Sequence, residues 1–179
     1  MRVMFQGTSL RLCVLLAALM ALWVSARAAD CAADPEVMLR EINALRAAPQ
    51  RCGAHQLPAA PALQWNAALG ESSQRYAEEL AQRDEISHQG VVHRSLRQRL
   101  AAVGYAMSMA GENLSGGAES LDQVLLQWLS SPVHCDSLMS ADFADVGLAC
   151  VQQAGRFGHF WVLHLASPLA AAAQRPGRR

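Results

Sequence analysis

Lysine is missing from the sequence. All 15 basic residues are arginine, so chemistry that needs a lysine amine, such as Schiff-base formation or a Walker-type phosphate lysine, is excluded. The HExxH pattern of zinc proteases is also absent, and Gly-x-Ser-x-Gly occurs nowhere after the N-terminal region. Of the 179 residues, 6% are aromatic, 17% are charged and 52% are hydrophobic. These values fit one globular domain rather than a disordered or low-complexity chain.

Long hydrophobic runs are confined to the N-terminus. Two arginines precede an apolar run at residues 12–24, and Ala-Arg-Ala at 26–28 is a small-x-small cleavage signal. The run is shorter than the ~20 residues that a permanent membrane helix needs. We therefore expect three regions: a signal peptide at residues 1–28, a single domain at 29–166 and a disordered C-terminal tail at 167–179.

Cleavage after residue 28 removes three arginines and leaves 12 basic against 15 acidic residues. This negative balance argues against nucleic acid as a partner. No later segment is long and apolar enough to be a transmembrane helix. The expected location is the periplasm or the outside of the cell.

Four cysteines remain in the expected mature chain: Cys31, Cys52, Cys135 and Cys150. An even number without a CxxC pair indicates two disulfides rather than a metal cluster. Of the three connectivities we favour Cys31–Cys52 with Cys135–Cys150, because each pair brackets one local unit. A free thiol pair is the alternative. A lipid anchor at Cys31 is disfavoured by Asp30, which stands where a small residue is expected.

Apolar spacing and capping residues predict several helices and a small sheet. Asp34-Pro35 and Asn66 are typical helix starts, and Ser131-Pro132 is typical of a cap and first helical position. The predicted helical segments are residues 34–47, 66–84, 95–103, 121–129 and 131–139. Strands are predicted at 145–151 and 160–166, joined by a Gly-containing hairpin connection, with a short strand near 107–110. Residues 48–61 are predicted to form a turn-rich connector.

The last predicted strand is apolar on both faces, because side chains alternate along a strand. Phe160 and Val162 share one face with His164, and Trp161, Leu163 and Leu165 share the other. Such a strand needs helices on both sides. We therefore predict an α+β fold, a three-layer α-β-α sandwich around a small antiparallel sheet.

Most histidines and tryptophans are interpreted as structural. The strand histidines expected to have local partners are His159 and His164. The histidines expected at the surface are His55 and His93. The tryptophans expected to anchor the core are Trp65, Trp128 and Trp161.

Three local patterns follow one another along the chain: Ser87-His88, the Gly-Glu-Asn-Leu of residues 111–114, and the Trp-Leu-Ser-Ser-Pro-Val-His of residues 128–134. Together with residues 42–46, 63–66, 100–105, 143–149 and 161–163, they resemble the CAP superfamily in its bacterial secreted branch. That superfamily covers cysteine-rich secretory, antigen 5 and pathogenesis-related class 1 proteins, which share the SCP domain. The resemblance covers residues 37–168, implies the α-β-α fold and supports the Cys135–Cys150 pairing.

In that family two histidines and one or two acidic residues line a central cleft. The matching positions here are His88, Glu112 and His134, whereas Ser131 stands where a second glutamate would fall. Two imidazoles and a carboxylate can supply three ligands of an open site for zinc or another divalent metal. Gly111 would allow close backbone approach, and Asn113 suits a turn. The alternative is a structural hydrogen-bond network, with His88 ending a helix and no ligand.

The resemblance implies a secreted binding module that takes a lipid or another small ligand, with a divalent metal as a candidate cofactor. The alternative is a metal-assisted hydrolase of peptide or cell-envelope substrates, in which Glu112 or a histidine such as His134 is the general base. The missing sequence signatures of hydrolases favour the binding role. A third interpretation is a purely structural or protein-interaction role.

Overall fold

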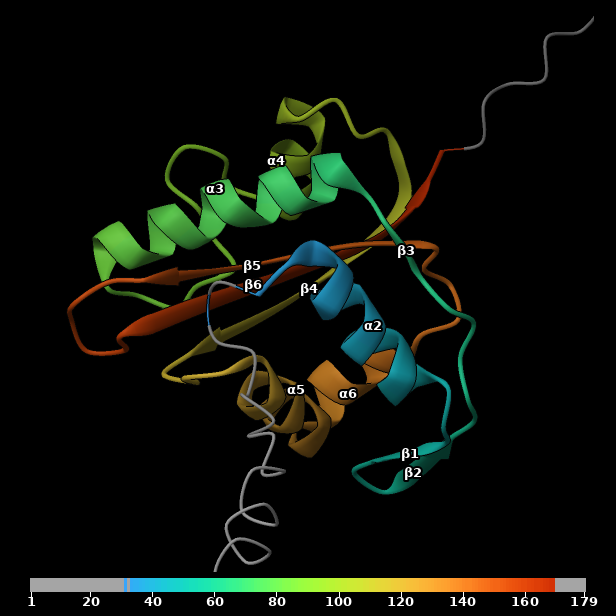
Figure 1. Cartoon of the computed structure of the whole chain (residues 1–179). Helices are drawn as coiled ribbons and strands as arrows, with labels where there is room; N and C mark the ends of the chain where they lie inside the picture. The colour runs from blue at the N-terminus through green and yellow to red at the C-terminus, as the bar shows by residue number, and fades with distance from the viewer. Residues whose placement is uncertain (1–30, 32, 170–179) are drawn as a thin grey trace, which may run out of the picture.

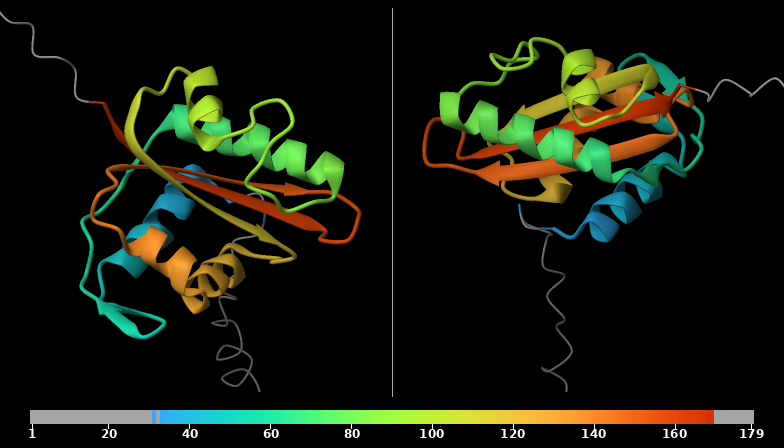
Figure 2. Two further views of the ribbon diagram at one scale, coloured as in Figure 1. Left: turned by 180° about the vertical axis from the view of Figure 1, so that it is seen from behind. Right: turned by 90° about the horizontal axis from the view of Figure 1, so that it is seen from above.

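A four-stranded sheet lies between two layers of helices in the computed structural model, which describes residue 31 and residues 33–169 (Figures 1 and 2). One face carries α3 (Ala67–Arg83) and α4 (Leu96–Ala102). The other face carries α2 (Pro35–Arg46), α5 (Leu121–Ser130) and α6 (Pro132–Met139). The predicted three-layer α+β fold is confirmed. The predicted signal peptide and residues 170–179 of the predicted tail lie outside the described residues.

The sheet has the order β3 (Gln64–Trp65), β5 (Asp145–Gln152), β6 (His159–Pro168) and β4 (Met107–Gly116). Strand β6 is antiparallel to both β5 and β4, and the short β3 is parallel to β5. Strand β6 runs through Pro168, two residues beyond the predicted end of the domain. A hairpin of β1 (Gln50–Cys52) and β2 (His55–Leu57) stands within the segment predicted as an irregular connector.

Strand β4 is longer than the sequence predicts. The Gly-Glu-Asn-Leu motif lies inside this strand, paired with β6, rather than in a turn after it. A Cβ atom added to Gly111 would lie 2.8 Å from the ring of Phe143. The absence of a side chain at Gly111 thus makes room for the side chain of Phe143 on the α6 side of the sheet, and the predicted backbone approach beside a ligand stays a prediction.

Helix starts follow the capping residues. The side chain of Asp34 accepts a hydrogen bond from the backbone N–H of Glu36, and that of Asn66 accepts from Ala68 and Leu69. Ser131 begins α6 as predicted, but its side chain makes no capping hydrogen bond there. The observed helix ends lie within two residues of the predicted ends.

The main apolar core fills the space between the sheet and the layer of α2, α5 and α6. Trp128 and Trp161 are fully buried in it, and Trp65 packs against it from a half-buried position. The indole N–H groups of Trp128 and Trp161 donate to the carbonyls of Leu114 and Ala118. The three tryptophans pack against the core, as predicted.

Helix α3 packs directly on β5. A Cβ atom at Gly147 would lie 2.2 Å from backbone atoms of α3, so only glycine permits this approach. The hydroxyl of Ser73 donates to the Gly147 carbonyl at 3.0 Å. This packing fixes the height of α3 above the sheet and thereby positions the side chains of its inner face.

Two disulfides are present, joining Cys31 to Cys150 and Cys52 to Cys135. The predicted number is right, but the predicted pairing, Cys31–Cys52 with Cys135–Cys150, is wrong. The β1–β2 hairpin packs against α6 and brings Cys52 to Cys135 within a small apolar cluster. Each disulfide joins the N-terminal third of the chain to its C-terminal half. The prediction fails because it pairs cysteines that are close in sequence, whereas the fold brings distant ones together.

Candidate functional site

A buried carboxylate lies at the centre of the candidate site. Glu112 is in the middle of β4, and its side chain is 4% exposed. Its Oε1 lies 2.7 Å from Nδ1 of His88. Its Oε2 accepts from Nη2 of Arg99 at 2.5 Å and lies 2.9 Å from Nε2 of His164. An ionised carboxylate can only accept, so both facing imidazole nitrogens carry a proton.

Four parts of the fold supply these groups. The β4–β6 register sets Glu112 directly opposite His164. Arg99 projects from α4, and His88 belongs to the loop between α3 and α4. Helix α3 ends at Arg83 with Asp84 as a left-handed cap, so His88 lies four residues beyond the cap and does not end the helix.

Arg99 and Tyr76 hold the loop that carries His88. Arg99 donates to the carbonyls of His93 and His88 at 3.1 and 3.4 Å. The hydroxyl of Tyr76 donates to the carbonyl of Ser87. The guanidinium of Arg99 also lies over the Tyr76 ring, 3.6 Å from its centroid. One cation thus ties the loop, α3 and the Glu112 carboxylate together.

The carboxylate of Glu112 is ionised at neutral pH. Burial by itself raises the pKa of Glu112, but the hydrogen bonds from His164 and His88, with the charge of Arg99, outweigh it and lower the pKa to about 2. A group with this pKa is a poor proton acceptor near neutral pH. Glu112 therefore suits the role of a fixed negative charge better than that of a general base.

His164 completes the cluster, although the sequence analysis leaves it outside the site. It is fully buried, and its ring stacks with Tyr76. Burial lowers the pKa of His164 despite the opposing effect of Glu112. With Nε2 protonated toward Glu112, the neutral ring keeps Nδ1 as a buried acceptor that has no hydrogen-bond partner among the described residues.

Arg99 is the second site residue that sequence reasoning missed. The sequence does predict that Arg99 faces inward, because this residue falls three residues after Leu96 and four before Val103, on the inward stripe of the predicted helix. His164 also faces inward between Val162 and Ala166. A buried Arg and a buried His each require partners, and Glu112 serves both.

His134 projects from α6 and is not hydrogen-bonded to Glu112. The amide of Asn113 donates to the His134 carbonyl at 3.0 Å and so joins β4 to α6. Burial lowers the pKa of the His134 imidazole, and the charge of His88 lowers it further. Of the predicted trio, the structure joins His88 to Glu112 by a hydrogen bond and places His134 within electrostatic reach of His88.

The predicted three-ligand metal set does not fit this arrangement. Within residues 31 and 33–169, no three His, Cys, Asp or Glu side chains are grouped so that they could hold a metal ion. Both oxygens of Glu112 already accept hydrogen bonds from Arg99 and the two imidazoles. The imidazole groups of the predicted trio that are not bonded to Glu112 are the outer nitrogen of His88 and the His134 ring.

The fold and the site together define a class of protein. Its features are an α-β-α sandwich, a Gly-Glu-Asn motif whose buried glutamate lies on an edge strand, and a histidine that is hydrogen-bonded to this glutamate. Residues 39–165 match the model of the CAP family, the cysteine-rich secretory protein family. The chain therefore belongs to the CAP family.

Three similar proteins come from bacteria. The chain is 22% identical over 99 residues to the uncharacterized protein YkwD of Bacillus subtilis (strain 168), covering 55% of this chain and 37% of YkwD. An extracellular SCP-domain protein of Bacillus anthracis str. Ames is 17% identical with a TM-score of 0.58, over 73% of this chain and 40% of that one. An outer surface protein of Borrelia burgdorferi is 22% identical with a TM-score of 0.63, over 75% of this chain and 92% of that one.

The matched region thus spans only about two fifths of YkwD and of the Bacillus anthracis protein. At these identities the structural likeness shows a shared fold.

Proposed function

We propose that this protein is an exported binding module whose ligand contacts are the imidazoles of His88 and His134. The observation that carries the proposal is the bond between His88 Nδ1 and the buried Glu112 carboxylate. This bond turns Nε2 of His88 outward on a side chain that is 64% exposed. A ring fixed in this way loses little conformational entropy when it binds a ligand.

Export is supported by two observations. Disulfides persist in oxidising compartments, and this chain has two. Two structural relatives are described as an extracellular protein and an outer surface protein. In the described part of the chain, no helix has the length and hydropathy to cross a membrane.

The ligand class that we propose is a lipid or another small molecule with a polar group that an imidazole can bind. The hydrogen bond to Glu112 raises the pKa of His88, so the protonated ring, which can donate from Nε2, persists to higher pH than in an unperturbed histidine. A divalent metal held by His88 and His134, without Glu112, is a second form of the same proposal. Two imidazoles would supply part of its coordination, and water would complete it.

The test has two readouts. Native mass spectrometry of the oxidised protein looks for a co-purified lipid, and calorimetry with zinc chloride measures metal binding. The His88→Ala and His134→Ala variants are compared with His55→Ala, whose side chain is exposed on β2. We expect ligand or zinc to be lost in the first two variants only. Equal behaviour of all three variants, or no bound species in any, would refute the proposal.

A second candidate function is hydrolysis, favoured specifically by the carboxylate–imidazole pair. Glu112 would orient His88 and stabilise its protonated form, while Nε2 takes a proton from water. Cleavage of peptide or cell-envelope material by the wild type, abolished in His88→Ala and retained in His55→Ala, is the expected signature. Unchanged cleavage in folded His88→Ala would eliminate this role.

A further inference from the structure

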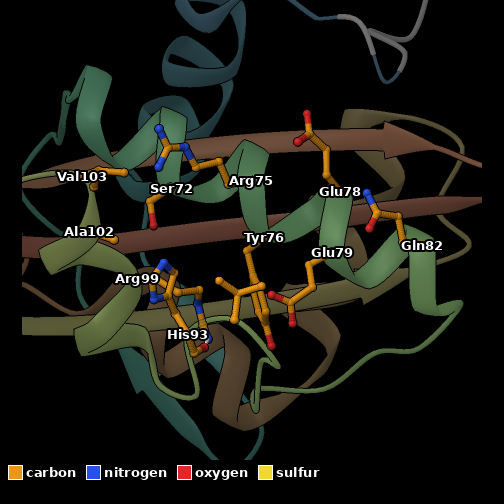
Figure 3. Close-up of a pocket in the computed structure, with 11 residues that line it drawn as sticks. Ser72, Arg75, Tyr76, Glu78, Glu79, Gln82, His93, Arg99, Ala102 and Val103 are labelled. Atoms are coloured by element: carbon orange, nitrogen blue, oxygen red, sulfur yellow. Dashed lines mark hydrogen bonds between the residues drawn. The ribbon is translucent and has the colours of Figure 1, made fainter.

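A pocket separate from the His88 and His134 contacts lies between α3, α4 and the loop before α4 (Figure 3). Its volume is about 290 Å³, close to the lower end of ordinary small-ligand sites. Tyr76 and Arg99 form its wall toward Glu112, and none of the residues His88, Glu112 and His134 lines it.

Two buried polar groups of this pocket have no partner among the described residues: the hydroxyl of Ser72 and the Nε–H of Arg99. Ser72 is 2% exposed and Arg99 is 4% exposed. In Figure 3 the Ser72 hydroxyl points from α3 toward Arg99. Buried donors in native proteins are nearly always satisfied. An oxygen acceptor at this end of the pocket would satisfy both donors.

The other end of the pocket is rich in acceptors. Glu78, Glu79 and Gln82 come from the C-terminal half of α3; the Glu79 carboxylate points toward Tyr76, whereas the Glu78 carboxylate points to the opposite side of the helix (Figure 3). Within the described residues, all hydrogen bonds to the two glutamates go to Oε1, from Gln74 for Glu78 and from Val91 and Arg83 for Glu79. The second carboxylate oxygens remain available to a donor.

The spacing of the two ends defines the ligand. Ser72 and Glu79 are seven residues apart on one helix, which is about 10 Å along its axis. We propose that the pocket binds a small zwitterion, with its carboxylate at Ser72 and Arg99 and its ammonium at Glu79. An extended peptide of three residues with free termini has about this length. The chemistry fits equally an amino-alkyl carboxylate of the same span.

The probe is trialanine, titrated into the ¹⁵N-labelled, oxidised protein and followed by the backbone amide signals of α3 and α4. Two blocked peptides serve as controls: N-acetyl-trialanine lacks the ammonium, and trialanine amide lacks the carboxylate. Each blocked peptide is expected to bind about tenfold more weakly or worse, since each loses one charged contact. Equal affinity of the three peptides would overturn the zwitterion assignment.

A matched pair of variants tests the location. Ala102 lines the pocket and is exposed on α4, whereas the neighbouring Ala101 is exposed but does not line it. Ala102→Phe should fill the pocket and abolish the response to trialanine, and Ala101→Phe should bind like the wild type. The proposal fails if trialanine at about 10 mM leaves the pocket amides of the folded wild type unshifted, or if both variants respond alike.

Discussion

The two helical layers are joined to the same sheet by different interactions. The layer of α2, α5 and α6 packs through one continuous cluster of 15 buried apolar residues. The layer of α3 and α4 has two smaller clusters, of seven and four residues. Arg99, Glu112 and His164 contribute buried polar groups on this second face. We refer to the two as the apolar layer and the polar layer.

The comparison shows how one sheet supports two kinds of packing. Apolar packing tolerates exchange of one side chain for another of similar volume. A buried ion pair does not tolerate loss of one member, because the other charge is left without a partner. The polar layer therefore fixes the geometry of His88 and Arg99, while the apolar layer supplies a core that does not depend on that geometry.

The largest expected effect concerns the disulfide of the apolar layer. Replacing Cys52 and Cys135 together by alanine should lower the free energy of unfolding by about 4 kcal/mol, because the bond closes a loop of 83 residues in the unfolded chain. Urea unfolding of the oxidised protein and the double variant measures this loss. Peptide mapping is the accompanying control, and recovery of a Cys31–Cys52 peptide would contradict the pairing.

Removing the central carboxylate should break the polar layer alone. Glu112→Ala leaves the guanidinium of Arg99 buried without its counter-ion, at an expected cost of about 3–4 kcal/mol in the same urea assay. Adding Arg99→Met should restore part of this loss, since it removes the unpaired charge. The control is Leu163→Ala in the apolar layer: it leaves no unpaired charge, so adding Arg99→Met should not restore its stability. A double variant less stable than Glu112→Ala would show that the ion pair is not the cause.

Acid should weaken the polar layer selectively. The pKa of Glu112 falls from 4.5 to about 2 in the folded state, so its contribution to stability is complete above about pH 4.5 and is lost as the pH falls toward 2. The lost contribution is of the order of 3 kcal/mol. Urea midpoints between pH 6 and pH 3 measure it. Leu163→Ala should keep this slope and Glu112→Gln should lose it; identical slopes would contradict the assignment.

The smallest effect distinguishes the two imidazoles. NMR titration should place the pKa of His88 above 6.5, because of its bond to Glu112, and that of His134 below 6.5, because of burial. The stabilising effect of the His88 bond is therefore present at low pH and is lost as the pH rises through the raised pKa. His88→Ala should raise the pKa of His134 only slightly, since burial remains. A His134 value restored to 6.5 would show that His88 is the main cause.

The apolar layer could largely be predicted from the sequence. Helix starts at Asp34 and Asn66, and the two apolar faces of β6, are local signals with a direct physical meaning. Strand β4 could not be bounded in this way. Its centre, Gly111 to Asn113, has the composition of a turn, and it forms a strand because β6 supplies a partner along its length. The disulfide pairs likewise depend on tertiary contacts.

The polar layer was predictable only in part. The resemblance to the CAP family gives His88, Glu112 and His134, but not their bonding. The sequence does not reveal that Glu112 is shared by Arg99 and His164, because these partners lie 13 and 52 residues away and meet only in the folded state. An inward-facing Arg or His shows that a partner exists without showing which one.

The nested disulfides impose an order on the maturation of the chain. Of the four disulfide-bonded cysteines, synthesis from the N-terminus presents Cys31 and Cys52 first, and their native partners follow only 119 and 83 residues later. Among these four, the first pair available for oxidation is therefore a non-native one. A compartment that only oxidises thiols would trap this product, whereas one that also exchanges disulfides would release it. A folding route that passes through this product therefore reaches the native pairs only by thiol–disulfide exchange.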